Sequence, residues 1–318
     1  MKITVIGCGR WGSFIAYYLS SIGNDVTVYG RVTSPEMQRF ITSGENGMVR
    51  FPDTIKLSYD LKSSLEAEVT VISINSQGLR SLLAEIDAHR PVNKTFILCM
   101  KGLEIGTGMR LSQITKELTS PTNRIAVWLG PCHVQEFLRG TPNCMVIDSE
   151  NEHLKTDLAD AFSSDLIRFY YGQDLVGNEI GAAAKNVIGI AAGMLDGLNR
   201  SALKGALLAR GTHEIANLIE AMGGNPLSAY GLCHLGDYEA TVFSKFSHNR
   251  QYGESFVLGQ PFTQLAEGCH TVRAMMQLCE QYKTSLPICT AVNDVLYHAQ
   301  SAEQTLNALF ARRRTNEF

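Results

Sequence analysis

One lysine interrupts a long run of small and apolar residues near the middle of the chain. Positions 181–195 are almost wholly Gly, Ala, Ile, Val and Met, yet they include Lys185, which is followed by Asn186. Loss of water disfavours the charged form of a lysine and makes its amine a usable proton donor and acceptor. Lys185 is therefore a candidate acid/base group. The alternative is a lysine that snorkels to solvent from a helix packed closely on another helix.

The spacing around Lys185 predicts a helix whose two faces differ. Five apolar residues recur at the intervals of a core-facing helical stripe. They are Ile180, Ala184, Val187, Ala191 and Leu195. The face that carries Lys185 instead holds mainly glycine and alanine, from Gly181 to Gly193. These residues are too small to shield an ammonium group, so something outside the helix is expected to fill the space beside it.

The N-terminus carries a glycine pattern typical of a dinucleotide-binding turn. A β-branched run at 2–6 leads into a G-x-G-x-x-G sequence, and a helical stretch follows. Such glycines let the backbone approach a pyrophosphate, whose charge the helix N-terminus favours. The residues predicted to bind this cofactor are Gly7, Gly9, Arg10, Trp11 and Gly12. The alternative is a glycine turn that binds nothing.

Arg31 follows the second predicted strand, at 24–29, where an acidic residue would bind the ribose hydroxyls of NAD. A guanidinium at this point suits a 2′-phosphate. The sequence therefore favours NADP(H) as cofactor, with NAD(H) as the second choice. An arginine that lies in solvent beside a helix is the alternative.

Three further short apolar runs, at 69–74, 95–100 and 125–129, are typical of central strands of a parallel sheet. Asn75, Lys101 and Gly130 each follow one of them. Ligands bind beyond the carboxyl ends of the strands in such sheets, so these loops are expected to line one cleft. Lys101 is then a second cation at the ligand site, unless it is an ordinary solvated loop lysine.

From about residue 174 the β-runs disappear and helical periodicity dominates. Helices are predicted at 177–195, 201–222, 264–282 and 291–297. The sequence thus predicts an α/β, Rossmann-like doubly wound domain at 1–176, followed by an all-helical substrate domain at 177–318. Residues 231–237, Thr241 and the polar stretch 244–250 are expected to lie on loops between the helices, where they could hold a phosphate or simply be solvated.

Composition excludes several classes of protein. The 28 basic and 31 acidic residues give a formal charge of -3, which argues against a general nucleic-acid binder. The run Arg312, Arg313 and Arg314 is interpreted as a solvated tail.

The eight cysteines form no C-x-x-C pair and are expected to be reduced. No apolar run has the length of a membrane span, and the histidines lack metal-site spacing, so a cytoplasmic protein without metal is predicted.

Short motifs spread through the chain resemble the soluble, nicotinamide-dependent glycerol-3-phosphate dehydrogenases of the bacterial type. Besides the glycine turn, they are Lys101-Gly102-Leu103-Glu104, Gly130-Pro131, Lys185-Asn186-Val187-Ile188, Asp196-Gly197-Leu198, Gly236-Asp237, Asn249-Arg250, Glu267-Gly268 and Leu286-Pro287-Ile288. The resemblance implies a Rossmann domain followed by an all-helical domain, as in 6-phosphogluconate dehydrogenase. It also implies the reduction of dihydroxyacetone phosphate to sn-glycerol 3-phosphate, which supplies glycerophospholipid synthesis.

The same resemblance implies a role for individual residues. Lys185 would be the acid/base group, Asp237 would orient it, and Lys101 would polarise the reacting oxygen. The residues expected to bind the phosphorylated substrate are Lys101, Gly130, Cys132, Asn186, Thr241, Ser247, His248, Asn249 and Arg250. Lys101, Val134 and Glu267 are expected near the cofactor, and a homodimer is expected. The small residues beside Lys185 would leave room for nicotinamide and substrate.

Several residues depart from the family pattern on the substrate side. His248 stands where the family carries an arginine, and a histidine offers fewer donors to a phosphate and is only partly charged at neutral pH. Cys132 and the pair Cys233-His234 are further departures. Two rival functions therefore stay open. One is a ketone or hydroxy-acid reductase with a different substrate, and the other is a module that binds NADPH as a sensor without turnover.

Overall fold

The computed structural model describes residues 1–311, so the arginines at 312–314 lie outside the described residues. The chain divides into two compact units. The first contains Met1–Lys101 and Arg110–Leu175, and the second contains Gly102–Met109 and the chain from Val176 onward. The short segment 102–109 belongs to the second unit because Leu103 is fully buried in its core and Gly106 donates a hydrogen bond to Gln277.

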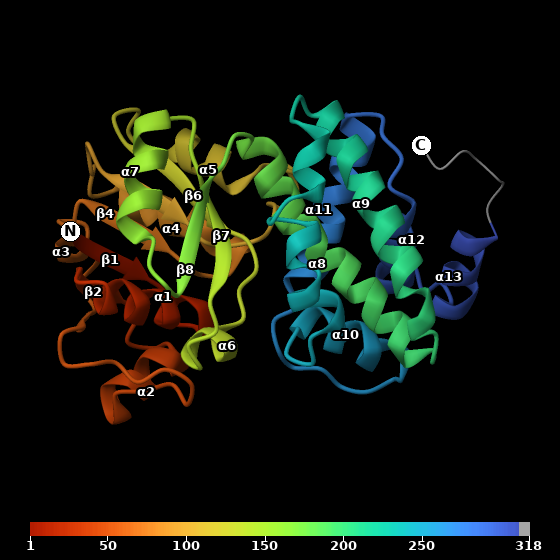
Figure 1. Ribbon diagram of the computed structural model, residues 1–318, viewed down its shortest axis with the longest axis horizontal. Helices are drawn as coiled ribbons and strands as arrows, with labels where there is room; N and C mark the ends of the chain where they lie inside the picture. The colour runs from red at the N-terminus through yellow and green to blue at the C-terminus, as the bar shows by residue number, and fades with distance from the viewer. Residues whose placement is uncertain (312–318) are drawn as a thin grey trace. The chain divides into compact units, whose positions relative to one another are not determined.

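The first unit is built on one eight-stranded sheet (Figure 1). Its strands are β1 (Lys2–Ile6), β2 (Asp25–Tyr29), β3 (Lys56–Ser58), β4 (Val69–Ile72), β5 (Thr95–Leu98), β6 (Arg124–Leu129), β7 (Asn143–Asp148) and β8 (Ile167–Tyr171). Their order is β3-β2-β1-β4-β5-β6-β7-β8. All neighbours run parallel except β6 and β7. The order reverses between β1 and β4, which is where such sheets bind dinucleotides.

Helices cover both faces of this sheet. They are α1 (Arg10–Ser21), α2 (Pro35–Ser43), α3 (Leu61–Ser64), α4 (Leu79–Asp87), α5 (Leu111–Leu118), α6 (Val134–Leu138) and α7 (Glu152–Phe162). Alternate residues of a strand face opposite sides of a sheet. On one side Val5 and Trp128 join buried residues of α1, α6 and α7 in a single apolar cluster. Helices α4 and α5 contact each other and bury residues such as Leu83 and Ile114 outside that cluster.

The second unit is helical in its described residues. Its helices are α8 (Leu175–Gly197), α9 (Lys204–Ala221), α10 (His248–Val257), α11 (Glu267–Gln281), α12 (Pro287–Tyr297) and α13 (Ala302–Phe310). The four helices predicted from periodicity are confirmed with shifted ends, and α12 begins at Pro287, a residue whose fixed φ suits the first helical position. The predicted fold class, a doubly wound Rossmann-like sheet followed by an all-helical domain, is confirmed.

The glycine face of α8 packs against other parts of the second unit. A Cβ at Gly181 would come within 2.9 Å of the His234 Cβ, and one at Gly193 would overlap the Arg250 carbonyl. A Cβ at Gly189 would clash with the Thr241 Cγ2, at 2.6 Å. The expectation that these small residues leave room for nicotinamide and substrate is therefore wrong. They let neighbouring backbone segments approach the helix that carries Lys185.

Gly193→Ala is expected to destabilise the fold strongly. The added methyl would overlap backbone atoms of α10, which cannot rotate away as a side chain could. A loss of about 3 kcal/mol in the free energy of unfolding is expected, at the upper end of overpacking effects. Gly205→Ala is the matched control, because a Cβ there meets nothing within 4 Å. Urea unfolding of both variants tests this, and equal midpoints would contradict it.

None of the helices in residues 1–311 combines the length and apolar character that crossing a membrane requires. The eight cysteines are free thiols.

Candidate functional site

The glycine turn of the first unit has the shape that a pyrophosphate needs. Gly7 has φ +102°, and a Cβ at Gly7 or Gly12 would overlap backbone oxygens of Ser73 or of Gly7 itself. A Cβ at Gly9 would meet nothing within 4 Å. Gly9 also precedes α1, whose first residue is Arg10, and no side chain caps this end of the helix. Unpaired N–H groups at a helix N-terminus favour an anion, so this turn fits a dinucleotide.

Two residues expected near the cofactor have side chains that pack against the core or lie in it. The Trp11 indole ring stacks on Phe14 at 5.4 Å between centroids and packs edge-on against Trp128. Val134 is 5% exposed and belongs to the same apolar cluster. Contact with a cofactor at these two positions would therefore rest mainly on the backbone, and their roles stay predictions.

Arg31 lies two residues after the end of β2, where the 2′-phosphate of NADP would bind. Its guanidinium forms an ion pair with Glu85 of α4 at 2.5 Å. Both side chains are exposed, at 62% and 42%. An ion pair so open to water is worth at most about 1 kcal/mol, so a phosphate could compete for the arginine.

Lys101 lies just beyond β5 and reaches the loop that follows β6. Its Nζ donates to the Gly130 carbonyl at 2.5 Å and lies 3.0 Å from the Cys132 Sγ. The loop after β4 also reaches this edge, because Ser73 lies against Gly7. Lys101 therefore links the loops after β5 and β6, and the expectation that all three loops line one cleft stays a prediction.

The second unit holds a buried ion pair between the predicted acid/base residue Lys185 and Asp237. The Lys185 Nζ lies 2.8 Å from the Asp237 Oδ2 and donates to the Thr241 Oγ1 at 2.7 Å. The Lys185 side chain is 8% exposed and that of Asp237 is 0% exposed. The Thr241 hydroxyl donates to the Asp237 carbonyl at 2.8 Å, so its oxygen is turned to accept from the ammonium. A lysine held in this way does not snorkel to solvent.

Local structure explains how these three side chains meet. Asp237 ends a 3-10 turn, Leu235–Asp237, and Thr241 lies in the π-helical turn Glu239–Phe243 that follows. Single π-helical turns occur frequently at functional sites. The two turns place the carboxylate and the hydroxyl on the same side, facing the middle of α8.

Asn186, which follows Lys185 in the sequence, forms a second polar pair with Asn249. The Asn249 Nδ2 donates to the Asn186 Oδ1 at 3.0 Å, and the Asn249 Oδ1 accepts from the Gly268 N–H at 2.9 Å. Glu267 and Gly268 are the first two residues of α11. The structure therefore brings Asn186, Asn249 and the first turn of α11 together, and their roles with substrate and cofactor stay predictions.

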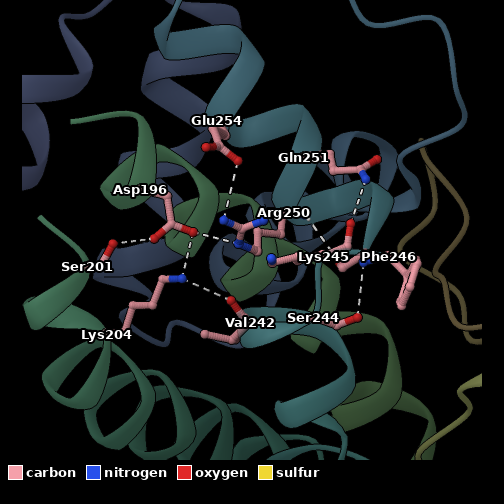
Figure 2. A network of polar contacts seen from close by, with 11 residues as sticks. Asp196, Ser201, Lys204, Val242, Ser244, Lys245, Phe246, Arg250, Gln251 and Glu254 are labelled. Atoms are coloured by element: carbon pink, nitrogen blue, oxygen red, sulfur yellow. Dashed lines mark hydrogen bonds and ion pairs between the residues drawn. The ribbon is translucent and has the colours of Figure 1, made fainter. Parts of the chain in front are cut away.

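The Arg250 guanidinium contacts two carboxylates of the second unit. Its Nε donates to the Asp196 Oδ2 at 2.6 Å, and its Nη2 lies 3.4 Å from Glu254. The same Asp196 oxygen accepts from Lys204 at 2.6 Å, and Lys204 also donates to the Val242 carbonyl at 3.1 Å (Figure 2). Asp196 is flanked by these two cations, which hold its pKa below the usual range against the opposing effect of burial. Arg250 thus has two carboxylate partners in the structure, and its role with substrate stays a prediction.

Ser247 and His248 lie at the start of α10. Ser247 is the N-cap and accepts from the Arg250 N–H at 3.3 Å. The His248 Nδ1 lies 3.2 Å from the Leu265 carbonyl, which can only accept, so Nδ1 carries the proton. The expectation that 248–250 lie on a loop is wrong, because these residues form the first turn of α10.

Asp196, Lys204 and His234 are structural partners of the site that sequence reasoning did not assign to it. Asp196 and Lys204 lie in motifs that the resemblance covers, but no local pattern shows that they pair. His234 is expected from the sequence only as part of the loop 231–237 and as a departure from the family. A buried histidine has no periodic signal, so its contacts could not be read from the sequence.

A glycine turn for a dinucleotide in a Rossmann sheet, together with a buried lysine and aspartate in a helical unit, defines a class of NAD(P)-linked dehydrogenases. Family models agree: the N-terminal model of NAD-dependent glycerol-3-phosphate dehydrogenase matches residues 2–155 and its C-terminal model matches 174–307. The chain belongs to the NAD-dependent glycerol-3-phosphate dehydrogenase family, which confirms the resemblance.

Individual relatives support the same assignment over nearly the whole chain. The chain is 33% identical to glycerol-3-phosphate dehydrogenase [NAD(P)+] of Syntrophomonas wolfei, over 99% of this chain and 96% of the relative. It is 34% identical to the Desulfitobacterium hafniense protein of the same name, with 99% and 93% covered. The crystal structure of glycerol-3-phosphate dehydrogenase from Coxiella burnetii superposes with a TM-score of 0.91 at 25% identity, covering 98% of this chain and 99% of that one.

Proposed function

We propose that this protein reduces dihydroxyacetone phosphate to sn-glycerol 3-phosphate with NAD(P)H, and that the reaction is reversible. The observation that carries the proposal is the buried contact of Lys185 with Asp237 and Thr241. A sensor that only binds the cofactor has no use for such a group. In this proposal the product supplies glycerophospholipid synthesis in the cytoplasm, and the protein acts as a homodimer.

Lys185 moves the proton in this reaction. NAD(P)H bound at the glycine turn supplies the hydride. The Lys185 ammonium gives a proton to the carbonyl oxygen during reduction, and its amine accepts the proton of the 2-hydroxyl in the reverse direction. Asp237 keeps the ammonium charged and oriented, and Thr241 fixes one of its N–H groups. Lys101 polarises the same oxygen and Asn186 contacts the substrate in this proposal.

NADP(H) is proposed as the preferred cofactor because Arg31 stands after β2 in place of a carboxylate. Its partner Glu85 is exposed, so a 2′-phosphate could replace Glu85 as the partner of the guanidinium.

The steady-state assay that tests the function follows oxidation of NADPH and of NADH with dihydroxyacetone phosphate. The same assay with unphosphorylated dihydroxyacetone and simple keto acids tests the rival reductase. If the phosphate gives no advantage in kcat/KM, the proposed substrate is wrong.

His248→Arg is expected to improve the use of the phosphorylated substrate. A neutral histidine that donates through Nδ1 presents Nε2 as an acceptor, which does not suit a phosphate. An arginine always donates and binds phosphate through two N–H groups. A fall in KM for dihydroxyacetone phosphate of about 10-fold or more is expected, since a hydrogen bond to a charged group contributes ~1.5–3 kcal/mol.

The matched control for this variant is His153→Arg, which adds the same charge at an exposed position of α7. It should leave KM unchanged, and neither variant should change the use of unphosphorylated dihydroxyacetone. An unchanged KM for dihydroxyacetone phosphate in His248→Arg would show that residue 248 does not limit phosphate recognition. A gain with the unphosphorylated ketone instead would favour the rival reductase.

A further inference from the structure

His234 is a buried imidazole to which the proposed reaction gives no task. It is 0% exposed and lies at the start of the 3-10 turn that carries Asp237. Its Nδ1 lies 2.8 Å from the Gly181 carbonyl, and its Nε2 lies 2.7 Å from the Tyr238 hydroxyl. Both ring nitrogens therefore have a partner within the second unit.

The partners fix the protonation state of the ring. A carbonyl only accepts, so Nδ1 carries the proton and donates to Gly181. The Nε2 lone pair then accepts from the Tyr238 hydroxyl. Burial raises the pKa of Tyr238, which keeps that hydroxyl protonated, and burial lowers the pKa of His234 from 6.5 to about 4. The ring is neutral at neutral pH.

This imidazole joins the two backbone segments whose side chains form the Lys185–Asp237 contact. Gly181 lies one helical turn before Lys185 on α8, so both residues share a face. The Asp237 N–H donates to the His234 carbonyl at 3.0 Å, and Tyr238 directly follows Asp237. The ring also lies against the bare backbone of α8, since a Cβ at Gly181 would approach the His234 Cβ to 2.9 Å.

We propose that His234 is a positioning residue for proton transfer: by bonding to Gly181 and Tyr238, its neutral imidazole holds Asp237 at the distance and angle that Lys185 requires. The inference rests on the proposed function. His234 touches no reacting atom. It acts through the backbone on both sides of the ion pair, and its neutrality keeps a second positive charge away from Lys185.

The charged and titratable groups around the ring support this role. Lys185 of α8 opposes protonation of His234, and Asp237 favours it. Tyr238 connects the ring to α9, where Glu214 adds negative charge near the phenol. Because the folded pKa of His234 is depressed, its neutral state contributes stability that is present above pH 6.5 and is lost as the pH falls towards about 4.

The test compares His234→Leu, His234→Asn and Tyr238→Phe in steady-state reduction of dihydroxyacetone phosphate across pH. His234→Leu keeps the volume but removes both hydrogen bonds. It should lower kcat by about 10-fold or more, as small displacements of a reacting group do, with KM for NADPH unchanged. The pH at which kcat falls should also shift. His234→Asn can still donate to Gly181 and should recover part of kcat, and Tyr238→Phe should show a smaller loss.

Thermal unfolding of each variant separates positioning from a purely structural role. His298→Leu, at an exposed position after α12, is the control. It should change neither the melting temperature nor kcat and its pH profile. If His234→Leu lowers the melting temperature but leaves kcat and its pH profile as in the wild type, the inference is overturned. If His234→Leu does not fold, His234→Asn and Tyr238→Phe decide in the same way. Failure of the wild type to reduce dihydroxyacetone phosphate would instead contradict the proposed function.

Discussion

Replacing Lys185 by alanine is expected to lower kcat for dihydroxyacetone phosphate by about 10²–10⁴-fold, the range that general acid–base catalysis contributes. The substitution removes the group proposed to protonate the carbonyl oxygen, and it leaves Asp237 buried without its cation. Affinity for NADPH should change little, because the glycine turn belongs to the first unit. Stopped-flow turnover and fluorescence titration of NADPH measure the two effects separately.

Lys155→Ala provides the matched control for this experiment. Lys155 is also buried, at 3% side-chain exposure, and forms an ion pair with Glu152 at 2.8 Å on α7 of the first unit. Its loss should affect stability but not kcat. Unimpaired turnover in Lys185→Ala would remove Lys185 from the mechanism, and an equal loss in Lys155→Ala would show that the effect comes from general destabilisation.

Asp237→Asn is expected to have the second largest effect, on both stability and activity. Asparagine has the same shape but no charge, so the buried Lys185 ammonium would lose the Asp237 carboxylate as its counter-ion. Breaking one side of a buried ion pair typically costs about 3–5 kcal/mol. Lys185 would relieve this cost by losing its proton more readily. Reduction needs the protonated amine, so kcat should fall and its decline with rising pH should begin at a lower pH than in the wild type.

Asp148→Asn is the control for this variant. Asp148 is 2% exposed, and it accepts from the backbone N–H groups of Ser149 and Asp174 in the first unit. It should lose stability while keeping the pH profile of kcat. If Asp237→Asn shows the wild-type pH profile, Asp237 does not control the protonation of Lys185.

Much of the first unit could be predicted from the sequence. The strands β1, β2, β4, β5 and β6 are short β-branched or apolar runs, and the glycine turn follows the first of them. The strands β3, β7 and β8 were not predicted. β3 has three residues, and β8 lies at the edge of the sheet with Tyr170 and Tyr171 exposed, so neither shows the continuous apolar run of a central strand.

The proposed acid/base site was predictable only in part. Lys185 stands out because its neighbours are apolar, whereas Asp237 and Thr241 are far from it in sequence, and their roles beside Lys185 came from the resemblance alone. The glycines beside Lys185 were misinterpreted because sequence cannot say what fills a gap, and the structure fills it with backbone of the same unit. The first turn of α10 was mistaken for a loop because its polar residues show no apolar period, although Ser247 is a typical N-cap.

The most direct test of the central claim follows a label from the reduced cofactor into the product. The enzyme is incubated with NADPH that carries deuterium at the transferred position of the nicotinamide, together with dihydroxyacetone phosphate, and the product is analysed by mass spectrometry. The account predicts sn-glycerol 3-phosphate with one deuterium on carbon 2, formed by the wild type and lost with Lys185→Ala. Oxidation of NADPH without deuterated glycerol 3-phosphate, or labelling that persists at the wild-type rate in Lys185→Ala, would contradict it.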